Sequence, residues 1–177
     1  EYPEMPVEDG DNAFTLPSNL LLDAINKTIF CTADAELRPV MNGVFFDLNE
    51  EKITMVATDA HRLVRYSSDV VKGAQPVSFI LPKKPAQLLR QVLQKDAEDV
   101  VVTFGQKNAK IVFGTTVIVC RQIEGRFPNY NAVIPQNNTN KVVVDRQTMV
   151  NACKRVAVFA NTGTSLLKLA LSENSIK

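Results

Sequence analysis

The sequence predicts an α+β fold built from short strands and short helices, and two observations support this prediction. Short runs of mostly apolar residues are separated by polar turns such as "NEEK", "GQKN" and "GTT", as the strands of a sheet are. Two other segments repeat their apolar residues about every 3–4 positions, as amphipathic helices do. Each helical segment follows one short strand and precedes three more, so the chain up to residue 121 has the order βαβββ twice.

The first βαβββ unit is expected to open with a brief strand at 13–17, "AFTLP". Pro17 stands where the start of a helix tolerates a proline. Residues 18–31 then form a helix of about four turns, and one of its faces carries Leu21, Leu22, Ile25 and Ile29. Three strands follow, the first two joined by the polar turn "NEEK", at 40–48, 52–58 and 61–67.

The second unit opens with a strand at 76–81, "PVSFIL". A helix is expected at 84–96, "KPAQLLRQVLQKD", with its core face made of Leu88, Leu89, Val92 and Leu93. The segment 99–123 then forms a meander of strands that reverses at the turns "GQKN" and "GTT".

The start of this pattern recurs after residue 140. Residues 16–30 align with residues 144–158, because their apolar positions coincide and Lys27 falls opposite Arg155. A tandem repeat at domain length is one interpretation, and the polar stretch 129–140, "NYNAVIPQNNTN", would be its linker. The chain would then begin in the tail of one repeat, contain a second repeat whole and stop inside a third.

Composition is that of an ordinary globular protein, with 45% hydrophobic and 22% charged residues. No apolar run approaches the roughly 20 residues that a membrane helix needs. Cys31, Cys120 and Cys153 are far apart and flanked by apolar residues, so they are interpreted as reduced core thiols of a cytoplasmic protein. No phosphate-binding glycine loop is present, and no cofactor is expected.

The only histidine, His61, lies in "MVATDAHRLVRY", two residues after Asp59. A single histidine, without a cysteine pair at zinc spacing, predicts no metal site. Asp59 and His61 can be interpreted as the acid–base pair of a hydrolase, with Ser67 or Ser68 as nucleophile. The alternative is a tight turn, in which the Asp59 carboxylate accepts hydrogen bonds from backbone amides two residues on and His61 packs beside it.

Basic residues are unevenly distributed although the formal net charge is only +1. The stretches 70–95 and 146–172 contain several lysines and arginines and no acidic residue. The outer faces of the predicted helices are therefore basic or neutral. This pattern suits a surface that faces a polyanion, on which lysines and arginines contact phosphates, as in a binding module that grips DNA by charge. Ordinary solvated helices are the alternative.

Several motifs closely resemble the bacterial sliding clamps, the beta subunits of DNA polymerase III. These are "MNGVFF" (41–46), "ATDAHRL" (57–63), "LPKK" (81–84), "EGRFPNY" (124–130) and "LSEN" (171–174), and they occur in the family's order over essentially the whole chain. The resemblance implies the DNA-clamp fold, in which each domain has two βαβββ halves, with helices on the inner, DNA-facing side and antiparallel sheets outside. It also implies a homodimeric ring around double-stranded DNA, bound without regard to sequence, and a processivity factor that is no enzyme.

The resemblance further implies a hydrophobic pocket between the second and third domains. In the family this pocket takes short peptides of the replicative polymerase catalytic subunit, the clamp loader and repair polymerases. The matching residues here are Met41, Thr58, Ala60, His61, Arg62, Leu63, Pro128 and Val133. The expected DNA-facing residues are Lys27, Lys83, Lys84, Arg90, Lys154 and Arg155, whereas Pro39 and Val40 replace aromatic residues that contact DNA in family members.

Overall fold

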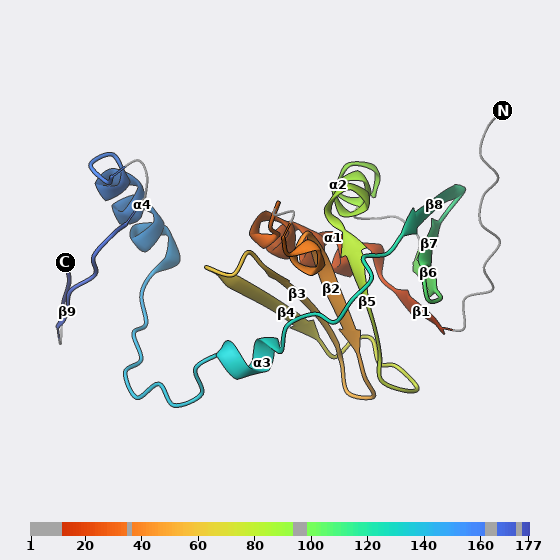
Figure 1. The fold of residues 1–177 in the computed structure, drawn as a ribbon. Helices are drawn as coiled ribbons and strands as arrows, with labels where there is room; N and C mark the ends of the chain where they lie inside the picture. Colours follow the sequence, from red (N-terminus) through yellow and green to blue (C-terminus); the bar gives the residue numbers. More distant parts are fainter. Residues whose placement is uncertain (1–11, 35–36, 94–98, 162–165, 173–174) are drawn as a thin grey trace. The chain divides into compact units, whose positions relative to one another are not determined.

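The computed structural model describes residues 12–34, 37–93, 99–161, 166–172 and 175–177 (Figure 1). The chain divides into two compact units, unit 1 at 1–134 and unit 2 at 135–177.

Unit 1 has the predicted βαβββ order twice. Its first half comprises β1 (Asn12–Leu16), α1 (Ser18–Thr28), the 3₁₀ turns η1 (Ile29–Cys31) and η2 (Pro39–Met41), β2 (Gly43–Leu48), β3 (Ile53–Thr58) and β4 (Leu63–Ser68). Its second half comprises β5 (Val77–Pro82), α2 (Lys83–Val92), β6 (Val100–Phe104), β7 (Asn108–Phe113) and β8 (Thr116–Arg121). A short helix, α3 (Tyr130–Val133), follows.

The two halves exchange their first strands. The sheets have the orders β4-β3-β2-β5 and β1-β6-β7-β8, and all their pairs are antiparallel. The first strand of the chain thus pairs with β6 of the second half, with Asn12 opposite Phe104, and β5 pairs with β2 of the first half, with Gly43 opposite Pro82. Each half therefore completes the sheet of the other, and the two halves fold as one body.

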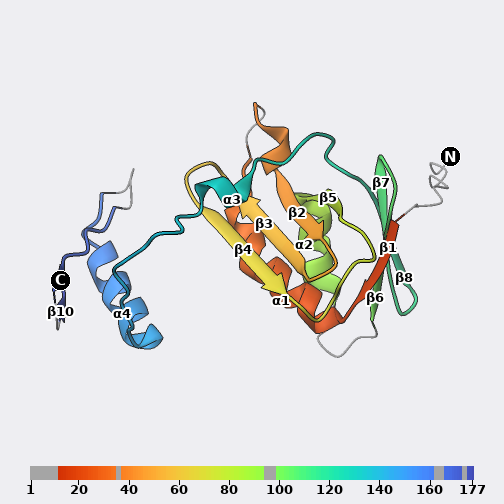
Figure 2. The same ribbon diagram turned by 90° about the horizontal axis from the view of Figure 1, so that it is seen from below.

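Helices α1 and α2 lie side by side on one face of the sheets (Figure 2). Helix α1 packs on β3 and β4, and α2 packs on β2 and β5. The predicted core face of α1 is confirmed, because Leu21, Leu22, Ile25 and Ile29 are all buried. These residues join inward-facing side chains of both sheets in a single apolar core.

The opposite face of the sheet β4-β3-β2-β5 is also covered. All six residues of β3 are buried, although a strand at a protein surface usually buries only one face. The segment after β8 accounts for this, because Phe127 and Tyr130 pack with Val56 and Ile80 in a second apolar cluster. This segment carries the "EGRFPNY" motif.

Two predicted strands begin two or more residues later in the structure than expected, whereas the other predicted strand starts differ by one residue. The strand expected at 40–48 begins at Gly43, because Pro39–Met41 form the 3₁₀ turn η2. Gly43 suits this point, since a side chain there would collide with the Leu81 carbonyl of the neighbouring strand. The strand expected at 61–67 begins at Leu63, because the two preceding residues belong to a turn.

The core face predicted for α2 was half wrong. Leu89 and Leu93 are buried, but Leu88 and Val92 are 43% and 41% exposed. The helix packs on the sheet through a narrow stripe that Ala86, Leu89 and Leu93 form, so the flanking apolar residues stay at the surface. The helix ends at Val92, and residues 94–96 of the predicted helix lie outside the described residues.

The three cysteines are free thiols. Cys31 is buried, whereas Cys120 and Cys153 are half-buried, so only the first is a full core residue. Burial raises the pKa of Cys120 to about 11, which keeps that thiol protonated at neutral pH.

Unit 2 contains α4 (Arg146–Ala157) and a hairpin of β9 (Leu171–Ser172) and β10 (Ser175–Ile176). The helix coincides with the predicted repeat of α1. Asp145 caps it by accepting a hydrogen bond from the Thr148 amide at 2.8 Å. No residue of α4 is buried, in contrast to the equivalent face of α1.

Candidate functional site

The turn between β3 and β4 holds most of the residues that the "ATDAHRL" motif singled out. The Asp59 carboxylate oxygen Oδ1 accepts hydrogen bonds from the amides of His61, at 3.0 Å, and Arg62, at 2.9 Å. The Thr58 hydroxyl accepts from the Ala60 amide at 3.2 Å and donates to the Arg62 carbonyl at 2.8 Å. Ala60 has a φ of 75°, in the left-handed region. The tight turn predicted from the sequence is confirmed.

Arg62 ties this turn to the end of the first helical segment. Its Nε donates to Asp59 Oδ2 at 2.8 Å, and its Nη2 donates to the Phe30 carbonyl at 3.1 Å. The guanidinium also lies 5.8 Å from the centre of the Phe30 ring. The Arg62 amide and guanidinium lower the pKa of Asp59 to about 2, so this carboxylate is ionised at neutral pH.

This geometry does not favour an acid–base pair. Both Asp59 oxygens accept hydrogen bonds from the turn's own amides and from Arg62. His61 is exposed rather than packed beside the turn, and no hydrogen bond joins its ring to Asp59 among the described residues. Asp59 therefore shapes the turn, and His61 presents its imidazole at the surface.

The "EGRFPNY" segment packs against the outer face of β2 and β3. Phe127 stacks on Phe45 with ring centroids 4.6 Å apart. The Tyr130 hydroxyl donates to Asp47 Oδ2 at 2.7 Å. Leu63, at the start of β4, packs against the same cluster as Phe127 and Tyr130. The two motifs, far apart in the chain, therefore meet through Leu63.

Phe127 and Tyr130 were missing from the predicted site residues. Their signal was present, because both are aromatic residues within a motif already singled out. Only the fold shows that they anchor the segment while their neighbours stay at the surface. Pro128, next to Phe127, is half-buried, and Val133 at the end of α3 is 67% exposed.

The eight residues expected to form the pocket thus differ in burial. Thr58 is buried, and Met41, Leu63 and Pro128 are half-buried. The exposed members are Ala60, His61, Arg62 and Val133. The eight therefore combine half-buried apolar side chains with exposed ones, a mixture that suits an apolar peptide anchor. None of them lines the cavity that unit 1 has beside Phe45 and Phe127.

The basic residues expected on the helices fall into two groups. Lys27 pairs with Asp23 at 2.7 Å, and Lys83 pairs with Asp34 at 2.5 Å. The other four are exposed and have no ion pair within the part of the chain that the structure describes, namely Lys84, Arg90, Lys154 and Arg155. Two of the six cations therefore already have an acidic partner.

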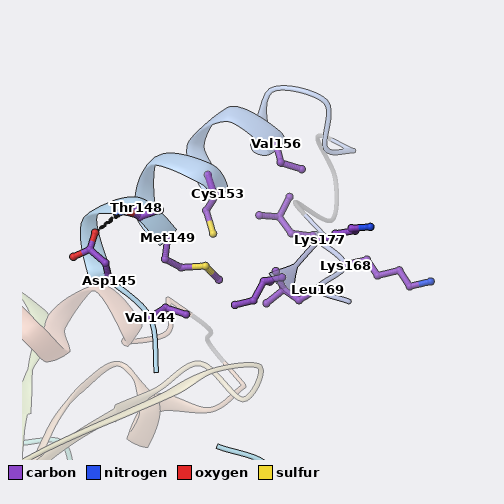
Figure 3. A pocket seen from close by; sticks show the side chains of 12 residues that line it. Val144, Asp145, Thr148, Met149, Cys153, Val156, Lys168, Leu169 and Lys177 are labelled. Atoms are coloured by element: carbon purple, nitrogen blue, oxygen red, sulfur yellow. Dashed lines mark hydrogen bonds between the residues drawn. The ribbon is translucent and has the colours of Figure 1, made fainter. Parts of the chain in front are cut away.

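Unit 2 has an apolar cavity of about 510 Å³ between α4 and the hairpin (Figure 3). Met149, Cys153 and Val156 of α4 face Leu169 across it. Unit 1 has a second cavity, of about 500 Å³, beside the stack of Phe45 and Phe127.

Neither a metal site nor a membrane helix emerges from the described part of the chain. No group of three histidine, cysteine or acidic side chains there is placed to hold a metal ion. None of its helices combines the length and apolar character that crossing a membrane requires.

Comparisons with known proteins agree on one family. Residues 15–129 match the model of the DNA polymerase III beta subunit, central domain. The beta sliding clamp of Haemophilus influenzae is 31% identical over 177 residues, which are 100% of this chain and 48% of that protein. The solved sliding clamp of Pseudomonas aeruginosa bound to griselimycin has a TM-score of 0.92 at 28% identity, over 99% of this chain and 48% of that one.

A third relative is the solved DNA polymerase III beta subunit of Thermotoga maritima. Its TM-score is 0.89 at 29% identity, again over 99% of this chain and 48% of that one. The chain thus spans about half the length of the curated relatives and solved structures that it matches.

Proposed function

Because the chain belongs to the family of DNA polymerase III beta subunits, we propose that it works as part of a sliding clamp. In this role it helps to form a homodimeric ring that encircles double-stranded DNA and tethers the replicative polymerase. Residues 11–135 serve as the central domain, residues 1–10 as the tail of the preceding domain, and residues 136–177 as the start of the next.

One observation carries this proposal. The chain combines the clamp fold of its solved relatives with helices α1, α2 and α4 that hold several basic residues and a single acidic one, Asp23. Lysines and arginines on such helices contact phosphates and give affinity without reading sequence. The proposed DNA-facing residues are Lys27, Lys83, Lys84, Arg90, Lys154 and Arg155.

The mechanism is topological, and the clamp is no enzyme. A closed ring keeps the polymerase on DNA because the duplex cannot leave the ring, so a strong grip on the backbone is unnecessary. The near-neutral formal net charge of +1 agrees with this role. A module that grips DNA by charge alone is usually far more basic.

The test uses the full-length clamp that carries this sequence, loaded on nicked circular DNA by a clamp loader. A nuclease with a single site then linearises the DNA, at a salt concentration that suppresses charge-driven binding. We expect the protein to be retained on circles and lost after linearisation. Retention on linear ends, or loss from intact circles in salt, would contradict a ring.

We also propose that the β3–β4 turn and the "EGRFPNY" segment form one side of a partner-binding pocket. Its residues are Met41, Thr58, Ala60, His61, Arg62, Leu63, Pro128 and Val133. The ligand is a short peptide with an apolar anchor, carried by the polymerase catalytic subunit, the clamp loader and repair polymerases. The hydrogen-bonded turn supports this role, because a rigid rim loses little entropy when a peptide binds.

Alanine substitutions in the full-length clamp test the pocket. Leu63→Ala and His61→Ala are expected to weaken binding of a clamp-binding peptide, the first by about tenfold or more. Val117→Ala is the matched control, because Val117 is a 48% exposed apolar residue on β8, outside the pocket. Fluorescence anisotropy measures the affinity, and equal affinities for all three variants would rule out this pocket.

A further inference from the structure

Two lysines of the proposed DNA-facing surface are held by carboxylates from different parts of unit 1. Asp23 and Lys27 are one turn apart on α1, with Nζ and Oδ2 separated by 2.7 Å. Asp34 lies between η1 and η2 and reaches Lys83, the first residue of α2, at 2.5 Å. The second pair therefore joins two segments that are 49 residues apart in the sequence.

The two ion pairs are expected to contribute little to the folding stability of unit 1. In the first pair the lysine and aspartate side chains are 59% and 46% exposed, and in the second pair 27% and 77% exposed. Ion pairs at such exposed positions add little to folding stability. Their larger effect is local, because each carboxylate neutralises one of the basic residues of α1 and α2.

We propose that Asp23 and Asp34 compete with DNA phosphates for Lys27 and Lys83. Each aspartate occupies one lysine and so removes about one phosphate contact from the inner surface of the clamp. This inference rests on the proposed function and deepens it by naming the residues that keep the grip on DNA weak. A ring held on DNA by closure slides more easily when fewer phosphates are bound.

The salt dependence of DNA binding measures this effect directly. Each phosphate that a protein neutralises on duplex DNA contributes about −0.9 to the slope of log K against log salt concentration. Asp34→Asn and Asp23→Asn each remove a competing charge with little change in shape. We expect each variant to steepen the slope by about 0.9, and the double variant to steepen it by about twice as much.

The matched control is Glu124→Gln. Glu124 pairs with Arg121 at 3.0 Å, and the pair is 58% and 72% exposed, so the substitution makes the same change in net charge at an exposed ion pair. Neither residue lies on a helix, and Glu124 belongs to the segment that leads to the opposite face of the sheet. The control slope is expected to equal that of the native chain.

A second comparison measures the contribution of Lys83 with and without its aspartate partner. In the native chain, Lys83→Ala is expected to leave the slope nearly unchanged, because Asp34 already occupies that cation. In the Asp34→Asn background the same substitution is expected to remove about one contact, or about 0.9 of slope. Lys84→Ala, at an exposed position without an ion pair among the described residues, is expected to lose this amount in either background.

The experiment titrates the 177-residue chain and its variants with linear duplex DNA by fluorescence anisotropy over a series of salt concentrations. Thermal melts confirm that each variant is folded. Slopes of the aspartate variants equal to the native slope would overturn the inference, as would an equal steepening by Glu124→Gln. If Lys84→Ala and Arg90→Ala leave the slope unchanged while the aspartate variants steepen it, the proposed extent of the DNA-facing surface is wrong but the competition stands. If the native chain does not bind linear DNA, the competition is ruled out, whereas the ring is tested separately by retention of the full-length clamp on circular DNA.

Discussion

Phe127 lies flat against Phe45, with ring centroids 4.6 Å apart and an angle of 3° between the ring planes. Phe45 belongs to β2, and Phe127 belongs to the segment that follows β8. Leu63 packs against the same cluster from the start of β4. The stack therefore links the two motifs from which the partner-binding pocket is proposed.

Phe127→Ala is expected to lower the free energy of unfolding by about 3–5 kcal/mol, because it removes a buried ring and leaves a cavity. Urea denaturation at neutral pH measures this loss. Val133→Ala is the control, since that side chain is 67% exposed, and it is expected to change stability by less than about 0.5 kcal/mol. A loss below about 1 kcal/mol for Phe127→Ala would show that the stack contributes little.

Tyr130→Phe removes the hydroxyl that donates to Asp47 at 2.7 Å. The carboxylate then lacks its donor in a partly buried site, so the expected loss of stability is about 1–3 kcal/mol. Urea denaturation at pH 7 measures it. The substitution keeps the ring contact with Phe45, 6.2 Å between centroids, so a loss as large as that of Phe127→Ala would contradict this interpretation.

The hydrogen bond between Tyr130 and Asp47 also leads us to expect a change in stability at alkaline pH. Burial, and next the hydrogen bond to Asp47, raise the pKa of Tyr130 from 10.0 to about 12. The folded state thus binds the phenolic proton more tightly, so this stabilisation is fully present below about pH 10 and is lost as pH rises through 12. The stability difference between the native chain and Tyr130→Phe is expected to narrow over this range, and a constant difference would contradict the raised pKa.

Local sequence patterns predicted the parts of this fold that depend on local physics. Leu21, Leu22 and Ile25 recur with the period of a helix, and all three are buried. The same rule failed at Leu88 and Val92, because the width of a buried helix face depends on the sheet beneath it. The exchange of β1 and β5 between the sheets depends on pairing between distant residues, and no local pattern shows such pairing.

Local sequence patterns also predicted only part of the candidate site. The turn at Asp59 was predictable, because its hydrogen bonds run to amides two and three residues on. The partners of Phe127 and Lys83, by contrast, come from other elements of unit 1, Phe45 of β2 and the loop at Asp34. The fold determines whether a lysine forms an ion pair and whether an aromatic residue anchors a segment. The neighbouring residues in the sequence do not show this.

Asp59→Ala is expected to lower the free energy of unfolding at pH 7 by about 1–2 kcal/mol, because two amides of the turn lose their acceptor. His61→Ala is the control and is expected to leave stability unchanged, since His61 is exposed. Thermal denaturation of both variants beside the native chain measures the difference. Equal losses in the two variants would contradict the role given to the carboxylate.

The difference in stability between the native chain and Asp59→Ala is also expected to depend on pH. The Arg62 amide and guanidinium lower the pKa of Asp59 from 3.8 to about 2. The folded state therefore favours the ionised carboxylate, and this contribution is present above about pH 3.8 and is lost as pH falls towards 2. The melting temperatures of the native chain and Asp59→Ala are expected to converge between about pH 4 and pH 2.

Exchanging alanine and glycine is expected to have opposite effects on stability at Ala60 and Gly125. Ala60 has a φ of 75°, where a side chain is strained, so Ala60→Gly is expected to leave stability unchanged or to raise it by up to about 1 kcal/mol. Gly125 has a φ of 126°, and a Cβ there would approach Val40 Cγ1 to 2.8 Å. Gly125→Ala is therefore expected to lower stability by more than about 1 kcal/mol.

Ala86→Gly is the control for the first of these variants. Ala86 is buried within α2, where glycine costs backbone entropy, so this substitution is expected to lower stability by about 1 kcal/mol or more. Urea denaturation of all three variants measures the contrast. The same change from alanine to glycine is thus expected to be harmless in the β3–β4 turn and harmful in the helix. A loss at Ala60 equal to that at Ala86 would mean that the turn does not strain its alanine.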